Sequence, residues 1–97
     1  METGKEINDT KFVSIGFGNL VNRDRVIAVV NPDTLPSKRL MNDARDANKL
    51  LDATCGRKTR AIIVVDSGQI ILCGLHTDTI AGRLNLDANG KTDEEDL

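Results

Sequence analysis

The sequence predicts a small α+β domain with strands and helices in the order β-β-α-β-β-α. Two runs rich in valine and isoleucine, residues 25–30 and 61–65, favour strands because β-branched side chains suit a pleated sheet. Between these runs, apolar residues recur at helical spacing after Pro36. We therefore expect a sheet of two hairpins, with one main helix packed on it and a short helix near the C-terminus.

The first predicted strand is residues 11–15, and the Gly16-Phe17-Gly18-Asn19 stretch that follows it is typical of a turn. Glycine and asparagine accept a positive φ at little cost, which such turns often require. Residues 25–30 form the second strand, and Asn31-Pro32-Asp33 ends it. We expect these two strands to pair with each other as a hairpin.

The main helix follows this second strand. Thr34 or Ser37 can cap its N-terminus, and Pro36 suits the first turn because its fixed φ is already helical. One face of the helix forms an apolar stripe, while charged and amide side chains occupy the other positions. The stripe consists of Leu40, Met41, Ala44, Ala47 and Leu51. We expect it to lie against the sheet, with the polar side of the helix facing water.

The second hairpin and the last helix complete the predicted fold. Residues 61–65 are apolar without a break, which is typical of a central strand, and the turn Asp66-Ser67-Gly68 leads to a partner strand over residues 69–73. A short helix is expected from about residue 78 to residue 84, with Thr77 as its cap. Ile80 and Leu84 would form its buried face.

Charge is distributed unevenly along the chain. The 97 residues carry 13 bases and 15 acids, of which one base and five acids lie in residues 87–97, so residues 1–86 carry 12 bases and 10 acids. We expect a flexible extension over residues 1–10, one folded domain over residues 11–86 and a disordered acidic tail over residues 87–97, because a polar tail buries too little surface to offset its ordering entropy. So small a domain has a thin core, which favours self-association.

The sequence offers no catalytic constellation and no site for a metal or a cofactor. His76 is the only histidine, and no serine elbow accompanies it. Together with Cys55 and Cys73 it gives three zinc ligands, where a structural site takes four. Cys55, which lies beside two cations, is the one candidate for nucleophilic or redox chemistry. We therefore expect a protein that is not an enzyme.

The Gly16-Phe17-Gly18 stretch does not make a nucleotide-binding loop. A dinucleotide fingerprint requires a third glycine three residues further on, where Val21 stands. We expect a hairpin turn instead, with the Phe17 ring packed on the core or on a neighbouring subunit.

The N-terminal segment is polar and lacks the pattern of a signal peptide, and no apolar run has transmembrane length. These features predict a cytoplasmic protein with reduced thiols and no association with a membrane.

The strongest functional signal is the stretch Cys55-Gly56-Arg57-Lys58-Thr59-Arg60, which places three cations in four residues directly before a strand. Cations grouped in this way bind phosphates and other anions, and the planar fork of arginine fits a phosphate well. Side chains alternate along an extended chain. We therefore expect one of Arg57 and Lys58 to face a ligand and the other to face a carboxylate such as Asp52.

Arg23 and Arg25 add two cations at the start of the second strand, where the end of a hairpin can present them to a ligand. The chain has no tryptophan and no tyrosine, which argues against stacking on unpaired bases. The pattern therefore favours recognition of the phosphate backbone of a duplex by charge and shape.

Several motifs follow one another in a distinctive order, namely Ile15-Gly-Phe-Gly-Asn19, Arg25 at the head of a strand, Asn31-Pro32-Asp33, Lys38-Arg39 with Asp43-Ala-Arg-Asp46, and the stretch from Asp52 to Arg60. In this order the chain resembles the RemA family, the extracellular matrix regulatory proteins of bacteria, over residues 11–85. The resemblance implies a DNA-binding transcriptional regulator that needs no cofactor, has no evident small-molecule ligand and assembles into a ring-like homo-oligomer. Its targets would be genes for the extracellular matrix and biofilms.

The DNA-contacting positions of the family fall on Arg25, Arg57 and Lys58, and Arg60 and Arg23 are neighbouring cations that we add as candidates. Lys58 stands where arginine is common in the family, so its contact keeps the charge and lacks the bidentate fork.

Two other functions use the same cations. One is RNA binding by a ring-shaped oligomer, against which the scarcity of aromatic residues counts. The other is a protein-interaction module, in which Arg57, Lys58 and Arg60 meet acidic patches on partners, including the acidic tail of this chain.

Cys55 also stands where the family resemblance leads us to expect an aromatic residue, which would alter affinity or sequence preference.

Overall fold

The structure, a computed structural model, describes residues 11–85. The expectations for residues 1–10 and 87–97 lie outside the described residues. The elements follow in the order β1 (Phe12–Gly16), β2 (Asn19–Asn22), the 3₁₀ turn η1 (Arg23–Arg25), β3 (Val26–Val30), α2 (Leu35–Asp46), β4 (Leu50–Asp52), β5 (Ala61–Val65), β6 (Ile70–Cys73) and α3 (Thr77–Leu84).

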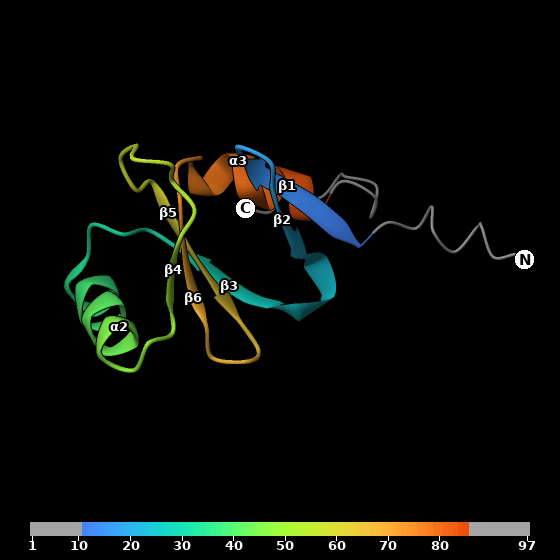
Figure 1. Ribbon diagram of the computed structural model, residues 1–97. Helices are drawn as coiled ribbons and strands as arrows, with labels where there is room; N and C mark the ends of the chain where they lie inside the picture. The colour runs from blue at the N-terminus through green and yellow to red at the C-terminus, as the bar shows by residue number, and fades with distance from the viewer. Residues whose placement is uncertain (1–10, 86–97) are drawn as a thin grey trace, which may run out of the picture.

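A four-stranded sheet forms the middle of the molecule, with its strands in the order β3-β5-β6-β4 (Figure 1). β5 is antiparallel to both of its neighbours, and β4 runs parallel to β6. β1 and β2 form a separate two-stranded hairpin. The α+β fold class is therefore confirmed, and so is the predicted hairpin that joins β5 to β6.

The predicted pairing of residues 11–15 with residues 25–30 is wrong. β1 pairs with β2 through a two-residue turn, in which Phe17 and Gly18 have φ values of 55° and 81°. Two positive φ values give the turn the twist that suits an antiparallel hairpin. The chain therefore returns at once along β2, whose four residues include too few apolar positions to be recognised as a strand, and β3 pairs with β5 instead.

The main helix α2 begins as predicted and ends earlier than the apolar stripe suggested. Its cap is Thr34, whose hydroxyl accepts a hydrogen bond of 3.2 Å from the amide of Ser37. The helix ends at Asp46, and Asn48 then takes a positive φ of 60°, which a continuing helix does not allow. Leu51 lies in β4, so the prediction that it belongs to the helical stripe is wrong.

The C-terminal helix α3 begins one residue earlier than expected. His76 occupies the N-cap position that the sequence assigned to Thr77, and its side chain makes no capping hydrogen bond. Ile80 is fully buried and Leu84 packs against the same cluster, so the predicted buried face of this helix is confirmed.

The core has two parts, one on each face of the four-stranded sheet. On one face α2 covers a cluster of four buried residues, which are Ala44, Ile62, Ile70 and Leu72. On the other face the β1–β2 hairpin and α3 cover a larger cluster that includes Ile15, Val21, Ile63, Cys73 and Ile80. β5 lies between the two clusters, and its residues Ala61, Ile62 and Ile63 have 0% exposed surface, which confirms its central position.

Replacement of Ile80 by alanine tests the packing of α3. The Ile80 side chain has no exposed surface, so Ile80→Ala should lower the free energy of unfolding by about 2–5 kcal/mol, because apolar burial is lost and a cavity remains. Thr79→Ala, at an exposed position of the same helix, is the control and should change that free energy by less than about 0.5 kcal/mol. Urea denaturation measures both, and equal effects of the two variants would contradict the packing described.

Candidate nucleic-acid interface

Residues 53–60, here called the basic loop, connect β4 to β5 and carry the three clustered cations. Both ends of the loop are held by the last residues of β6, because the Ala53 amide donates to the Leu72 carbonyl at 2.9 Å and the Arg60 amide donates to the Cys73 carbonyl at 2.8 Å. The loop therefore crosses the end of β6, and its middle projects beyond the sheet, at the upper left of Figure 1.

A tight turn at the start of the basic loop fixes its course. One carboxylate oxygen of Asp52, Oδ1, accepts hydrogen bonds from the Thr54 amide at 2.9 Å and from the Thr54 hydroxyl at 2.6 Å. The Thr54 carbonyl in turn accepts from the Arg57 amide at 3.0 Å, with Cys55 and Gly56 at positive φ between them. The hydroxyl bond, and then the amide bond, lower the pKa of Asp52 below its ordinary value because they stabilise the ionised carboxylate.

The expectation that Arg57 or Lys58 faces Asp52 is therefore wrong. Within residues 11–85 neither side chain forms an ion pair with this carboxylate, whose Oδ1 instead binds Thr54. Asp52 builds the loop and leaves the charge of the two cations uncompensated.

Phe17 supports the guanidinium of Arg57. The central carbon of the guanidinium lies 5.0 Å from the centre of the Phe17 ring, a cation–π contact worth about 0.5–1 kcal/mol at an exposed site. Phe17 is 50% exposed, so the expectation that its ring packs on the core is wrong. Packing on a neighbouring subunit stays a prediction. Its φ of 55° is uncommon for a bulky residue, and it aims the ring at the basic loop.

A side chain of the β1–β2 hairpin also contacts the backbone of the basic loop. The amide of the Asn19 side chain donates to the Ala53 carbonyl at 3.5 Å, beside the turn that carries Phe17. The Gly-Phe-Gly-Asn motif therefore serves as a support for the basic loop rather than as a phosphate-binding loop.

Arg60 completes the cationic group. Its Nη1 lies 3.4 Å from Nε2 of His76, the residue at the N-cap position of α3, and this contact holds the guanidinium beside the start of that helix. Arg57, Lys58 and Arg60 are all exposed, and within the described residues none of them forms an ion pair. The structure thus brings together three of the predicted site residues, and no carboxylate of residues 11–85 neutralises their charges.

The other two predicted site residues lie elsewhere. Arg23 and Arg25 belong to η1, at the far end of β5 from the basic loop. The extended chain from Arg60 to Asp66 spans six residue steps, which corresponds to about 20 Å. Arg25 forms an ion pair with Asp66 through Nη1 and Oδ2 at 3.2 Å. Arg23 lies 3.9 Å from Asp24, and its side chain is only 24% exposed. At this end Arg25 is balanced by Asp66, whereas Asp24 is shared between Arg23 and Lys11, whose Nζ lies 3.2 Å from Oδ2 of Asp24.

Sequence reasoning missed the groups that set this geometry. The Asp52-x-Thr54 pattern is typical of an Asx turn. It could have identified the Asp52–Thr54 lock, the two hydrogen bonds from Thr54 to Oδ1 of Asp52 that fix the start of the basic loop. No sequence signal indicated the stacking of Arg57 on Phe17 or the pairing of Arg25 with Asp66, because each contact joins segments about forty residues apart, which only the fold brings together.

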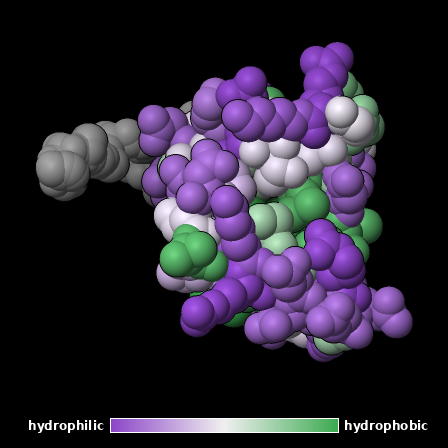
Figure 2. Space-filling model, turned by 90° about the vertical axis from the view of Figure 1, so that its left-hand side faces the viewer, coloured by the Kyte–Doolittle hydropathy of each residue, from purple (hydrophilic) through white to green (hydrophobic). Residues whose placement is uncertain are grey.

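The surface of this side of the molecule is mainly hydrophilic. Figure 2 views it from the left of Figure 1 and shows hydrophilic side chains above and below a smaller group of apolar ones. Leu35 at the start of α2 and Leu51 in β4 are among the large apolar residues that are exposed. Apolar surface of this kind is available for contact with another protein chain.

The described residues hold no evident centre for a metal. Within residues 11–85 no three side chains of histidine, cysteine, aspartate or glutamate gather as a metal site would require. Both cysteines are free thiols, Cys55 exposed in the basic loop and Cys73 buried, where its thiol donates to the Ile15 carbonyl at 3.4 Å. Among the helices of these residues none is long and apolar enough to cross a membrane.

Comparison with known proteins gives one consistent family. A model of RemA-like proteins, described as extracellular matrix regulatory protein A-like, matches residues 12–84. A protein of Dictyoglomus thermophilum described as a regulatory protein is 51% identical over 85 residues, which are 88% of this chain and 96% of the relative. A protein of Syntrophobacter fumaroxidans with the same description is 60% identical over 78% of this chain and 81% of the relative. Another, from Brevibacillus brevis, is 48% identical over 89% of this chain and 95% of the relative.

The Asp52–Thr54 lock predicts a pH dependence. Because the folded pKa of Asp52 is lowered, the stability that this carboxylate contributes is complete above its ordinary pKa and is lost as the pH falls through the lower folded value. Thr54→Val removes the hydroxyl donor and should move the pKa of Asp52 back toward its ordinary value, whereas Thr54→Ser keeps the donor and should leave the pKa low. A titration of the carboxyl carbon by NMR measures this pKa, and an unchanged value in Thr54→Val would exclude the lock.

Proposed function

This chain belongs to the RemA-like family, and from that premise we propose that it is a transcriptional regulator that binds duplex DNA through the basic loop. The observation that carries the proposal is the group of three exposed cations, Arg57, Lys58 and Arg60, on a loop fixed at both ends and free of ion pairs within the described residues. Because no carboxylate within residues 11–85 pairs with these cations, they are available to an external anion.

The geometry of the basic loop suits phosphates of a DNA backbone. Arg57 stacks on Phe17, so its guanidinium is partly ordered before a ligand arrives and loses less freedom when it donates to a phosphate. Lys58 offers a point charge, and Arg60 extends the charged surface toward α3. Contacts of this kind fix the position of a protein on a duplex, while sequence preference comes from the shape and deformability of the DNA.

A single copy of the chain has too few contacts for tight binding, so we include assembly into a ring-like homo-oligomer in the proposal. Several basic loops on one assembly make later contacts intramolecular, which can raise the overall affinity by roughly 10²–10⁴. Bending the duplex to reach them costs on the order of 1–6 kcal/mol. Two features support such self-association. The exposed side chains of Leu35 and Leu51 offer apolar surface, and the edge strands β3 and β4 offer unpaired backbone groups.

The proposed targets are genes for the extracellular matrix and biofilms, in line with the family description, and the proposed place of action is the cytoplasm. Neither a cofactor nor a small-molecule ligand enters the proposed mechanism.

RNA binding is the second candidate function, since the same cations would bind its phosphates. The aromatic content argues for the duplex. The chain has two phenylalanines and no tryptophan or tyrosine, and Phe17 is already stacked on Arg57. Recognition of single-stranded RNA relies on aromatic faces that stack on unpaired bases.

Replacement of Arg57 tests the proposed function. Fluorescence anisotropy with a labelled duplex over a series of salt concentrations should show steep salt dependence for the wild-type protein. Arg57→Ala should weaken binding and reduce the slope of log K against log salt by about 0.9 for every subunit that contacts the DNA. Arg39→Ala removes an exposed arginine of α2, outside the basic loop, and should leave the slope nearly unchanged.

Two outcomes would contradict the proposal. Equal effects of Arg57→Ala and Arg39→Ala would mean that the basic loop is not the contact surface. In a competition experiment, displacement of the labelled duplex by single-stranded RNA at a much lower concentration than by unlabelled duplex would favour RNA binding as the function. Analytical ultracentrifugation of the same samples tests the oligomer, and a monomer that still binds tightly would exclude the argument from avidity.

A further inference from the structure

The two cationic ends of the molecule differ in how their charge is balanced. The basic loop carries three cations without an ion pair among the described residues, whereas at the other end of β5 Arg25 is paired with Asp66. A duplex therefore meets a strong positive field at one end and a nearly neutral pair at the other. Arg25 is one of the DNA-contacting positions that the family resemblance implies, although its charge is balanced here by Asp66.

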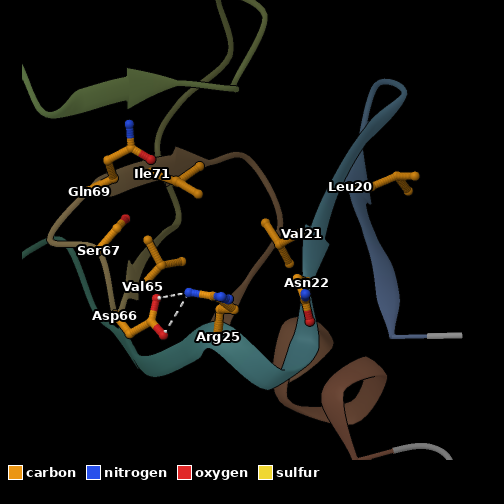
Figure 3. Close-up of a pocket in the computed structure, with 9 residues that line it drawn as sticks. All are labelled: Leu20, Val21, Asn22, Arg25, Val65, Asp66, Ser67, Gln69 and Ile71. Carbon is orange, nitrogen blue, oxygen red and sulfur yellow. Dashed lines mark hydrogen bonds and ion pairs between the residues drawn. The ribbon is translucent and has the colours of Figure 1, made fainter.

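The contact between Arg25 and Asp66 is well defined. Nη1 of Arg25 lies 3.3 Å from Oδ1 and 3.2 Å from Oδ2 of Asp66, so one nitrogen donates to both carboxylate oxygens. The backbones are joined as well, because the Asp66 amide donates to the Arg25 carbonyl at 2.9 Å. Both residues line an open pocket of about 240 Å³, whose apolar lining includes Val21, Val65 and Ile71. Figure 3 shows the side chains of Arg25 and Asp66 pointing toward each other.

We propose that Asp66 is a specificity-determining residue for DNA binding, which holds and neutralises Arg25 until a correctly placed phosphate takes over the guanidinium. This inference rests on the proposed function. Asp66 acts on Arg25 through its negative charge. It does not contact the DNA itself, because an ionised carboxylate has no hydrogen to donate to a phosphate.

The pair can be exchanged for a phosphate at low cost. The side chains of Arg25 and Asp66 are 63% and 45% exposed, and exposed ion pairs contribute little to stability. Only Nη1 of the guanidinium is engaged, which leaves its Nη2 and Nε donors for a phosphate. Since the backbone bond between Asp66 and Arg25 keeps η1 next to the β5–β6 turn, a change of side-chain rotamer is enough to release Arg25.

The consequence is discrimination between duplexes. Any duplex can engage the basic loop, but Arg25 adds its contact only where the path of the DNA brings a phosphate near η1, about 20 Å away along β5. Elsewhere the negative charge of Asp66 balances that of the guanidinium of Arg25 and repels the phosphate backbone. Asp66 therefore lowers affinity for straight or wrongly bent DNA more than for a duplex whose shape fits, which is a form of indirect readout.

Asp66→Asn tests the inference. Asparagine keeps the shape and an oxygen that can accept from Arg25, suits the turn that follows β5, and removes the charge. Asp43→Asn, on the exposed face of α2, removes one negative charge away from Arg25 and is the matched control. Both variants and the wild-type protein are titrated by anisotropy with a random-sequence duplex over a salt series, after thermal unfolding has shown that they fold alike.

Asp66→Asn should tighten binding to the random duplex by up to about fivefold for each subunit in contact, and more than Asp43→Asn does. Its salt dependence should also be steeper, because Arg25 then binds DNA with its charge uncompensated. If Asp66→Asn changes binding no more than the control does, or weakens it, the inference about Asp66 is overturned. The proposed function would still stand in that case, because the wild-type protein binds the duplex. Absence of duplex binding by the wild-type protein at low salt would overturn the proposed function itself, and the inference with it.

Discussion

The central strand β5 is the constraint on which the rest of the structure depends. Its first three residues have no exposed surface, because α2 lies on one side of the sheet and the β1–β2 hairpin with α3 lies on the other. β5 also pairs with both β3 and β6, so its length fixes the distance between the basic loop at its start and the Arg25–Asp66 pair at its end. A change in the register of this strand would move both charged groups and exchange the two faces of the core.

The basic loop shows how local chemistry places charge on so small a scaffold. Two hydrogen bonds to β6 fix its ends, the Asp52–Thr54 turn fixes its first bend, and Phe17 supports Arg57 from a different hairpin. None of these contacts consumes the charge of the cations. The acid that lies closest in sequence, Asp52, binds a threonine, so the field of Arg57 and Lys58 extends into the solvent, where an anion can meet it.

Much of this architecture could be predicted from the sequence. The uninterrupted apolar run of β5 identified the central strand, Thr34 was one of the two predicted caps of α2, and Ile80 identified the buried side of α3. The failures have a common physical cause. The pairing of β1 with the short β2, and the stacking of Phe17 on Arg57, depend on a turn with two positive φ values, and the backbone conformation of a bulky residue such as Phe17 cannot be inferred from its chemistry. For the candidate site, clustering of cations was visible in the sequence, whereas which cations are neutralised was decided by long-range contacts such as Arg25 with Asp66.

In the proposed function a duplex first contacts the protein at the basic loop. Hydrogen–deuterium exchange of backbone amides, measured with and without duplex DNA, tests it most directly, because it locates the contact without altering any residue. The account predicts that slower exchange on DNA binding will be greatest in residues 53–60 and in the adjoining segment 74–76. Slower exchange confined to α2, with residues 53–60 unchanged, would contradict it.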